Sequence, residues 1–198
     1  MSRSAPVLAV GLLCLGLVNC AQSGGGIAAG NTYDLVAPRS VAAASRTAPL
    51  QLQVYEPVAI EHALSGKRLM VRPGPAQVSY YKDVAWRDRL PRLVQARMIE
   101  SFENSGAVKS ASATSGQIGL ATELRAFEVD VSNGRAASKV DILARLTEPQ
   151  SGRVIATRGF KARVPAATDN PEDVVAALNR AFAKVQRDMI AWVTARRR

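Results

Sequence analysis

Histidine and cysteine, the side chains that most often carry catalysis or bind metals, are few in this chain. The one histidine, His62, lies beside Glu61 in a turn, and both cysteines, Cys14 and Cys20, lie within the first twenty residues. A zinc site needs several His, Cys or carboxylate ligands at suitable spacing. A Ser-His-acid device would need an activated serine near His62, whereas Ser65 lies in an ordinary loop. We therefore predict no enzyme activity, no metal site and no bound cofactor, with His62 solvated at the surface.

The first nineteen residues predict an export signal. An apolar run over residues 5–18 is shorter than the about 20 residues that a membrane-spanning helix needs, and it suits a signal-peptide core. The run ends in the letters LVNC at 17–20, which resemble a lipobox, although Asn19 stands where Gly, Ala or Ser is usual. We predict a signal peptide over residues 1–19 and covalent lipid, including palmitate, on Cys20. The alternative is ordinary signal cleavage nearby, which leaves a soluble periplasmic protein.

The residues after Cys20 predict where the domain is held. Residue 21 is Ala rather than Asp, and by the lipoprotein sorting rule this favours the periplasmic face of the cell outer membrane. Residues 20–32 are Gly-rich and predict a flexible tether with a root-mean-square reach of roughly 20 Å. Residues 33–195 are left as one domain, followed by a basic tail at 196–198.

The formal net charge of +10 is compatible with three kinds of partner: nucleic acid, anionic lipid or an acidic protein surface. Export argues against nucleic acid, because an exported protein meets envelope lipids and proteins instead. The basic residues are scattered, and Arg153, Lys161 and Arg163 share one strand face. We interpret such groups as solvated faces, with contact to anionic head groups or an acidic partner as the alternative.

One aromatic segment is a candidate partner-binding site. Tyr80, Tyr81 and Trp86 lie close together just before the first predicted helix. Neighbouring residues of a strand point to opposite faces, so one tyrosine is expected in the core and the other at the surface. Exposed aromatic residues are favoured at protein interfaces. The alternative is that Trp86 fills the junction between helix and sheet.

Hydrophobic periodicity predicts the elements that position these residues. Two helices are expected, one from Leu90 to Phe102 and one that Asn170 caps and Pro171 begins. In the segment 118–131 the apolar residues change parity, which predicts a β-bulge near Arg125 and Ala126. Further strands are expected over the ranges 33–37, 50–55, 67–72, 76–82, 140–146 and 154–164. Short turns such as Asn133-Gly134 favour antiparallel pairing. We predict the α+β class: a two-layer sandwich with a mostly antiparallel sheet of about six to eight strands and two main helices on one face.

A set of short motifs recurs in order along nearly the whole chain after residue 19. They are the lipobox ending at Cys20, Tyr33-Asp34-Leu35, Tyr80-Tyr81-x4-Trp86-x-Asp88-x-Leu90-Pro91-x-Leu93-Val94-Gln95, Phe102-Glu103-x-Ser105-Gly106, Glu123-Leu124-x-x-Phe127, Thr157-Arg158-x-Phe160 and Trp192-Val193. Together they resemble the ABC-type transport auxiliary lipoprotein component family, of which paraquat-inducible intermembrane transport lipoproteins are one branch.

The resemblance implies a role beside an ABC transporter that carries a mammalian-cell-entry domain protein and moves lipid between the two envelope membranes. The auxiliary component is expected to be a docking or adaptor piece at the outer membrane, since the chain has no Walker motif. Its implied partners are the mammalian-cell-entry protein and the membrane, the latter through the lipid, and a homo-oligomer is left open. Two alternatives remain: a periplasmic carrier that binds lipid itself, and an envelope lipoprotein that regulates a cell-wall enzyme.

Overall fold

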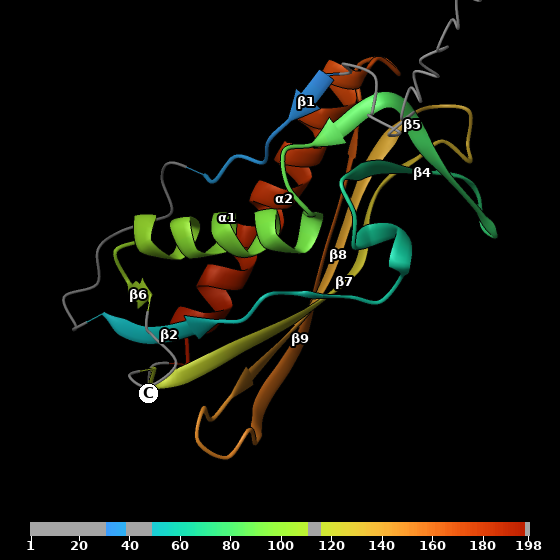
Figure 1. The fold of residues 1–198 in the computed structure, drawn as a ribbon. Helices are drawn as coiled ribbons and strands as arrows, with labels where there is room; N and C mark the ends of the chain where they lie inside the picture. Colours follow the sequence, from blue (N-terminus) through green and yellow to red (C-terminus); the bar gives the residue numbers. More distant parts are fainter. Residues whose placement is uncertain (1–30, 39–48, 111–115, 197–198) are drawn as a thin grey trace, which may run out of the picture.

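The computed structural model describes residues 31–38, 49–110 and 116–196. Strands, two main helices and one 3₁₀ turn follow one another through these ranges (Figure 1). Their bounds are β1 Asn31–Tyr33, β2 Leu50–Val54, β3 Val58–Ala59, η1 His62–Leu64, β4 Arg68–Gly74, β5 Gln77–Trp86, α1 Leu90–Asn104, β6 Val108–Ser110, β7 Ile118–Asp130, β8 Ala137–Thr147, β9 Val154–Pro165 and α2 Pro171–Thr194.

Three long strands, β7, β8 and β9, form an antiparallel meander, as the hairpin turns predict. The turn between β7 and β8 places Gly134 at φ 73°, a left-handed conformation that glycine adopts without steric cost. The β7–β8 register is interrupted between Leu124 and Ala126, which confirms the predicted bulge. Because of it, Leu124 and Phe127 are both fully buried although they lie three residues apart.

The other edge of β7 receives short strands in parallel orientation. β2, β3 and β4 pair with successive parts of β7, β6 then adds to β2, and β5 and β1 extend the sheet beyond β4. The described residues therefore form one mixed sheet of nine strands, more than the six to eight expected. The additional strands β3 and β6 are two and three residues long, which is too short to show an alternating pattern. The strand expected at 33–37 needs correction: β1 ends at Tyr33, and Leu35 and Ala37 are buried without forming a strand.

Both helices lie on the same side of the sheet, as expected, and they cross each other (Figure 1). Asn170 caps α2, because its side-chain oxygen accepts a hydrogen bond of 2.9 Å from the backbone N–H of Asp173. At the crossing, the Gln186 side-chain amide donates to the Ser101 hydroxyl at 2.7 Å. Both residues are buried, so this polar contact helps to set how the helices cross.

One hydrophobic core extends from Leu35 to Val193 between the helices and the sheet. We call the helix-covered side of the sheet its inner face and the opposite side its outer face. None of the helices in the described ranges combines the length and apolarity needed to cross a bilayer. The α+β class is confirmed. β1 begins at Asn31, two residues inside the predicted tether, and the signal peptide, most of the tether and the last two residues lie outside the described ranges.

Candidate functional site

Cys20, the predicted lipid site, lies outside the described residues, so its acylation stays a prediction. The described chain enters the domain at β1, where Tyr33 contacts the start of α2. The Tyr33 hydroxyl donates a hydrogen bond of 2.9 Å to the carboxylate of Glu172. The chain that leads from Cys20 therefore reaches the domain at the N-terminal end of α2.

Trp86 fills the core instead of forming a surface. Its side chain is buried at the end of β5, and its ring packs edge-on against Phe127, with 5.9 Å between ring centroids. Phe127 in turn packs against Phe182 of α2. The expectation that Trp86 belongs to a partner-binding site needs correction, because a side chain in this position cannot reach another protein while the domain stays folded. The alternative, a plug at the helix–sheet junction, describes its placement.

The two tyrosines have different surroundings. The Tyr81 hydroxyl donates to the backbone carbonyl of Asp169, which ties β5 to the loop before α2. Burial, supported by the negative charge of Asp169, raises the pKa of the Tyr81 phenol. Tyr80 lies half-buried under the guanidinium of Arg68, 3.6 Å from the ring centroid. The structure thus gives Tyr81 a structural contact and leaves the partner-binding prediction for Tyr80 open.

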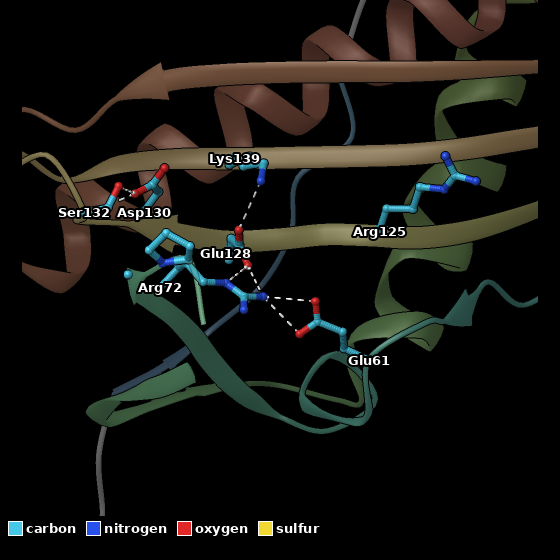
Figure 2. A pocket seen from close by; sticks show the side chains of 9 residues that line it. Glu61, Arg72, Arg125, Glu128, Asp130, Ser132 and Lys139 are labelled. Atoms are coloured by element: carbon cyan, nitrogen blue, oxygen red, sulfur yellow. Dashed lines mark hydrogen bonds and ion pairs between the residues drawn. The ribbon is translucent and has the colours of Figure 1, made fainter. Parts of the chain in front are cut away.

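The most developed group of charged residues lies on the outer face of the sheet, where β4, β7 and β8 meet the turn before η1 (Figure 2). These residues surround a polar depression of about 380 Å³, which we call the charged hollow. It is lined by Glu61, Arg72, Gly74, Pro75, Arg125, Glu128, Asp130, Ser132 and Lys139.

At the centre of the charged hollow, one buried carboxylate is held by two cations. The Glu128 side chain is only 3% exposed. Arg72 donates to the same Glu128 oxygen through Nε at 3.2 Å and Nη2 at 3.0 Å, while Lys139 Nζ lies 3.4 Å from the other oxygen. Arg72 Nη2 also lies 3.0 Å from both oxygens of Glu61 (Figure 2). Burial acts to lower the pKa of Arg72, but the hydrogen bonds to Glu61 and Glu128 outweigh it and raise that pKa.

A second carboxylate at the rim is also fully engaged. Asp130 accepts hydrogen bonds from the Ser132 hydroxyl at 2.6 Å and the Ser132 backbone N–H at 3.0 Å, and it pairs with Arg163. The Ser132 hydroxyl is the largest influence; with Arg163 it outweighs burial and lowers the pKa of Asp130 to about 2. Asp130 is therefore ionised at any physiological pH.

The arrangement suits a structural clamp better than a reactive centre. The hollow is lined by three cations and three carboxylates, so its charges balance and it holds no excess for an anion or a metal ion. In the ranges that the structure describes, no group of three His, Cys, Asp or Glu could hold a metal ion. His62 is exposed, and the Ser65 hydroxyl near it donates to the His62 backbone carbonyl at 2.7 Å. What the cluster does chemically is to fasten β4, β7, β8 and the turn before η1 to one another.

Sequence reasoning did not single out this cluster, although part of its signal was present. Glu128 and Lys139 have the parity opposite to the buried Phe127 and Val140, which places both on the outer face. Lys161 and Arg163, interpreted as a solvated face, pair with Asp141 and Asp130 respectively. Arg72 belongs to β4, and the periodicity of the sequence does not reveal that β4 pairs with β7.

Comparison with known proteins places the chain among bacterial relatives. Residues 33–190 match the model of the family described as ABC-type transport auxiliary lipoprotein component. The uncharacterized protein bll6063 from Bradyrhizobium diazoefficiens is 31% identical over 176 residues, which cover 86% of this chain and 47% of that protein. This chain therefore spans about half the length of that curated relative.

Solved structures share the fold. The crystal structure of protein XCC0632 from Xanthomonas campestris superposes with a TM-score of 0.77 and 24% identity, covering 83% of this chain and 95% of that one. The hypothetical protein CT253 from Chlamydia trachomatis gives a TM-score of 0.51 with 8% identity, over 75% and 97% of the two chains. At these identities the likeness concerns the fold alone.

Proposed function

The chain belongs to the family of ABC-type transport auxiliary lipoprotein components, and from this premise we propose that it is a lipid-anchored periplasmic adaptor of an intermembrane lipid transport system. In this proposal Cys20 carries the acyl chains and residues 21–30 form the tether. The folded domain then positions a mammalian-cell-entry domain protein of the ABC transporter at the outer membrane. The observation that carries the proposal is the family match over 33–190, which spans almost the whole folded domain.

The packing of the domain supports an adaptor over a lipid carrier. A carrier would need an apolar cavity of ligand size, whose typical volume is about 300–1,000 Å³. At the centre of the layer between helices and sheet, the rings of Trp86, Phe127 and Phe182 pack edge to face, and all three side chains are buried. The depression beside the C-terminal end of α2 has two arginines and one aspartate in its lining, which does not suit an apolar ligand. A core packed in this way instead suits the presentation of a fixed surface to another protein.

The anchor is tested by metabolic labelling with palmitate. The natural chain is expected to incorporate the label, and Cys20→Ala is expected to lose it, because the thiol is the acylation site. Cys14→Ala is the matched control, since this cysteine lies inside the predicted signal peptide, and it should label normally. Equal labelling of Cys20→Ala and the natural chain would exclude the proposed anchor, and absence of label from all three would indicate the soluble periplasmic alternative.

The adaptor role is tested by capture from solubilised membranes. A tagged full chain is expected to bring down a mammalian-cell-entry domain protein, and outer-membrane fractions are expected to contain both. Mass spectrometry of the same preparation distinguishes the alternatives: co-purified lipid in stoichiometric amount would support a carrier, and a peptidoglycan synthase a regulator of cell-wall enzymes. Consistent absence of the mammalian-cell-entry protein would refute the adaptor proposal.

A further inference from the structure

A second depression lies on the inner face, between the C-terminal end of α2 and the edge strand β9. We call it the distal hollow; its volume is about 500 Å³. Its lining consists of Arg158, Asp188, Ala191, Trp192, Ala195 and Arg196. None of these residues takes part in the charged hollow or in the core contacts of Trp86.

The cations of the distal hollow are held by aromatic rings instead of carboxylates. The guanidinium of Arg158 lies 5.3 Å from the ring centroid of Phe160, and that of Arg196 lies 5.3 Å from the ring of Trp192. Cation–π contacts orient a guanidinium without neutralising its charge. The one acid in the lining, Asp188, already pairs with Lys184 at 2.9 Å. The hollow therefore presents two oriented positive charges whose carboxylate-binding capacity is unused within the described chain.

The backbone beside the distal hollow is also available. β9 is twelve residues long, and in the described ranges it pairs with β8 alone, so its other edge is open. The exposed edge of a strand can accept an additional strand from another chain. At Gly159, next to Arg158, a Cβ atom would meet nothing within 4 Å, so the outer face of β9 is uncovered there. β9 itself contains three basic residues and no acidic one.

The position of the distal hollow favours a protein over the membrane as its occupant. Tyr33, near the point where the chain from Cys20 enters, contacts the first turn of α2. Arg196 follows the last turn of this helix of 24 residues, which is about 36 Å long at 1.5 Å per residue. Figure 1 shows β1 at one end of the domain and the C-terminal end of α2 at the other. Because the described chain enters the domain at β1, the hollow lies at the end of the domain remote from that entry.

We propose that the open edge of β9 and the distal hollow together bind an extended acidic segment of a partner protein. The segment pairs with β9 as an additional strand and places a carboxylate between Arg158 and Arg196. This inference deepens the proposed function and rests on it for the identity of the partner, because it assigns the surface through which an adaptor would hold another protein. It also predicts the chemistry of the contact: alternating acidic residues in an extended backbone.

The binding test follows the fluorescence of Trp192, which lines the distal hollow. The full chain, solubilised in a mild detergent, carries Trp86→Phe, which leaves Trp192 as the one tryptophan. The probe is a synthetic octapeptide that alternates Val and Glu; an otherwise identical peptide with Lys in place of Glu is the control. The acidic peptide is expected to change the fluorescence of Trp192 saturably, and the basic peptide is expected to leave it unchanged.

Charge reversals locate the contact. Arg158→Glu and Arg196→Glu are each expected to weaken peptide binding at least tenfold. Arg187→Glu makes the same reversal on an exposed position of α2 outside the hollow and should change binding less than twofold. Circular dichroism checks that each variant is folded. No saturable response, or an equal loss in Arg187→Glu, would overturn the proposal, and so would a response to phosphatidylglycerol vesicles without one to the peptide.

The partner experiment separates this inference from the function on which it rests. If the natural chain captures the mammalian-cell-entry protein and both Arg158→Glu and Arg196→Glu lose it, both proposals are supported. If the two variants capture it as well as the natural chain does, the adaptor function stands and the surface assignment falls. If the natural chain captures nothing while the acidic peptide still binds, the adaptor function falls and the peptide site remains.

Discussion

Replacing the buried carboxylate of Glu128 tests whether the charged hollow holds the sheet together. Glu128→Gln keeps the shape of the side chain but removes its charge, so the two hydrogen bonds from Arg72 lose their ionic component. One end of the new amide carries hydrogen-bond donors, and it must face a cationic donor of either Arg72 or Lys139. The substitution therefore weakens β4 and the turn before η1 against the sheet.

The loss of stability expected for Glu128→Gln depends on the ion pair that Arg72 retains with Glu61. Breaking a fully buried ion pair costs about 3–5 kcal/mol, because the remaining charge is left unpaired. Arg72 is 18% exposed and retains Glu61, so we expect Glu128→Gln to lower the free energy of unfolding by about 2–3 kcal/mol, below the buried-pair range. Arg72→Met leaves Glu128, only 3% exposed, with Lys139 alone, and should cost about 3–4 kcal/mol on the same basis.

The double variant shows whether these costs come from one interaction. With both charges removed, neither Arg72 nor the buried Glu128 is left as an unpaired charge, and only the more exposed Glu61 and Lys139 lose a partner. The combined loss should therefore be smaller than the sum of the two single losses by about 2 kcal/mol, within the range typical of residues in one ion-pair network. Urea unfolding of the chain from residue 21, followed by circular dichroism at pH 7, measures all three variants. At a slope of about 2 kcal/mol per molar urea, Glu128→Gln should lower the midpoint by about 1 M.

Glu148→Gln is the control, because it neutralises an ion pair at the exposed tip of the β8–β9 hairpin. Its partner Arg153 is 69% exposed, and exposed pairs contribute little to stability, so the midpoint should not move. If Glu128→Gln moved the midpoint no further than this control, or if the losses in the cycle simply added, the clamp would not exist as described.

Three further predictions follow from single contacts. Ser132→Ala should raise the pKa of Asp130 from about 2 toward 3.8, observed by NMR titration of the carboxyl group. In the natural chain the lowered pKa contributes up to about 2 kcal/mol of stability, at 1.36 kcal/mol per unit. This contribution is complete above about pH 4 and is lost as the pH falls through 2; acid unfolding that Ser132→Ala leaves unchanged would contradict it. Trp86→Ala should cost about 3–5 kcal/mol in urea unfolding, as a large core ring does, while Tyr80→Ala costs much less; the reverse order would place Trp86 at the surface. Asn170→Ala should cost about 1 kcal/mol through loss of the α2 cap, and an unchanged unfolding midpoint would show that the cap is not formed.

The periodicity of apolar residues was enough to predict the long elements, in which one face is buried over many residues. The apolar stripe of α2, the β7–β8–β9 meander and the change of parity around Arg125 all follow from where apolar side chains must be buried. These elements are long, so their patterns repeat often enough to be unambiguous. The short strands β3 and β6 have no such repeat, and the short alternation at 33–37 predicted a strand where only Tyr33 belongs to β1. The short strands β3, β6 and β1 pair in parallel with β7, β2 and β5 respectively, through backbone edges that side-chain periodicity does not reveal.

The candidate site was harder to predict for the same physical reason. Glu128 and Arg72 are 56 residues apart, and they meet because β4 lies beside the C-terminal part of β7. A charged residue interrupts the apolar pattern of a strand in the same way whether its side chain contacts water or forms an ion pair. Parity could therefore place Glu128 on the outer face but could not identify its partner. The aromatic segment was identified as a unit, yet the structure places Trp86 in the core, ties Tyr81 to the loop before α2 and leaves Tyr80 beside Arg68.

The bulge at Arg125 also limits how genes of this family can gain and lose codons. Inserting or deleting one residue within Ile118–Asp130 would turn half of β7 over, exposing Phe127 or burying a second carboxylate. Deleting the extra residue of the bulge would likewise move the side chains on one side of it to the opposite face of the sheet. The loops after β7 and β8, at 131–136 and 148–153, carry no such restriction. Alignments of relatives should therefore place their gaps at these two loops and keep the length of β7 constant.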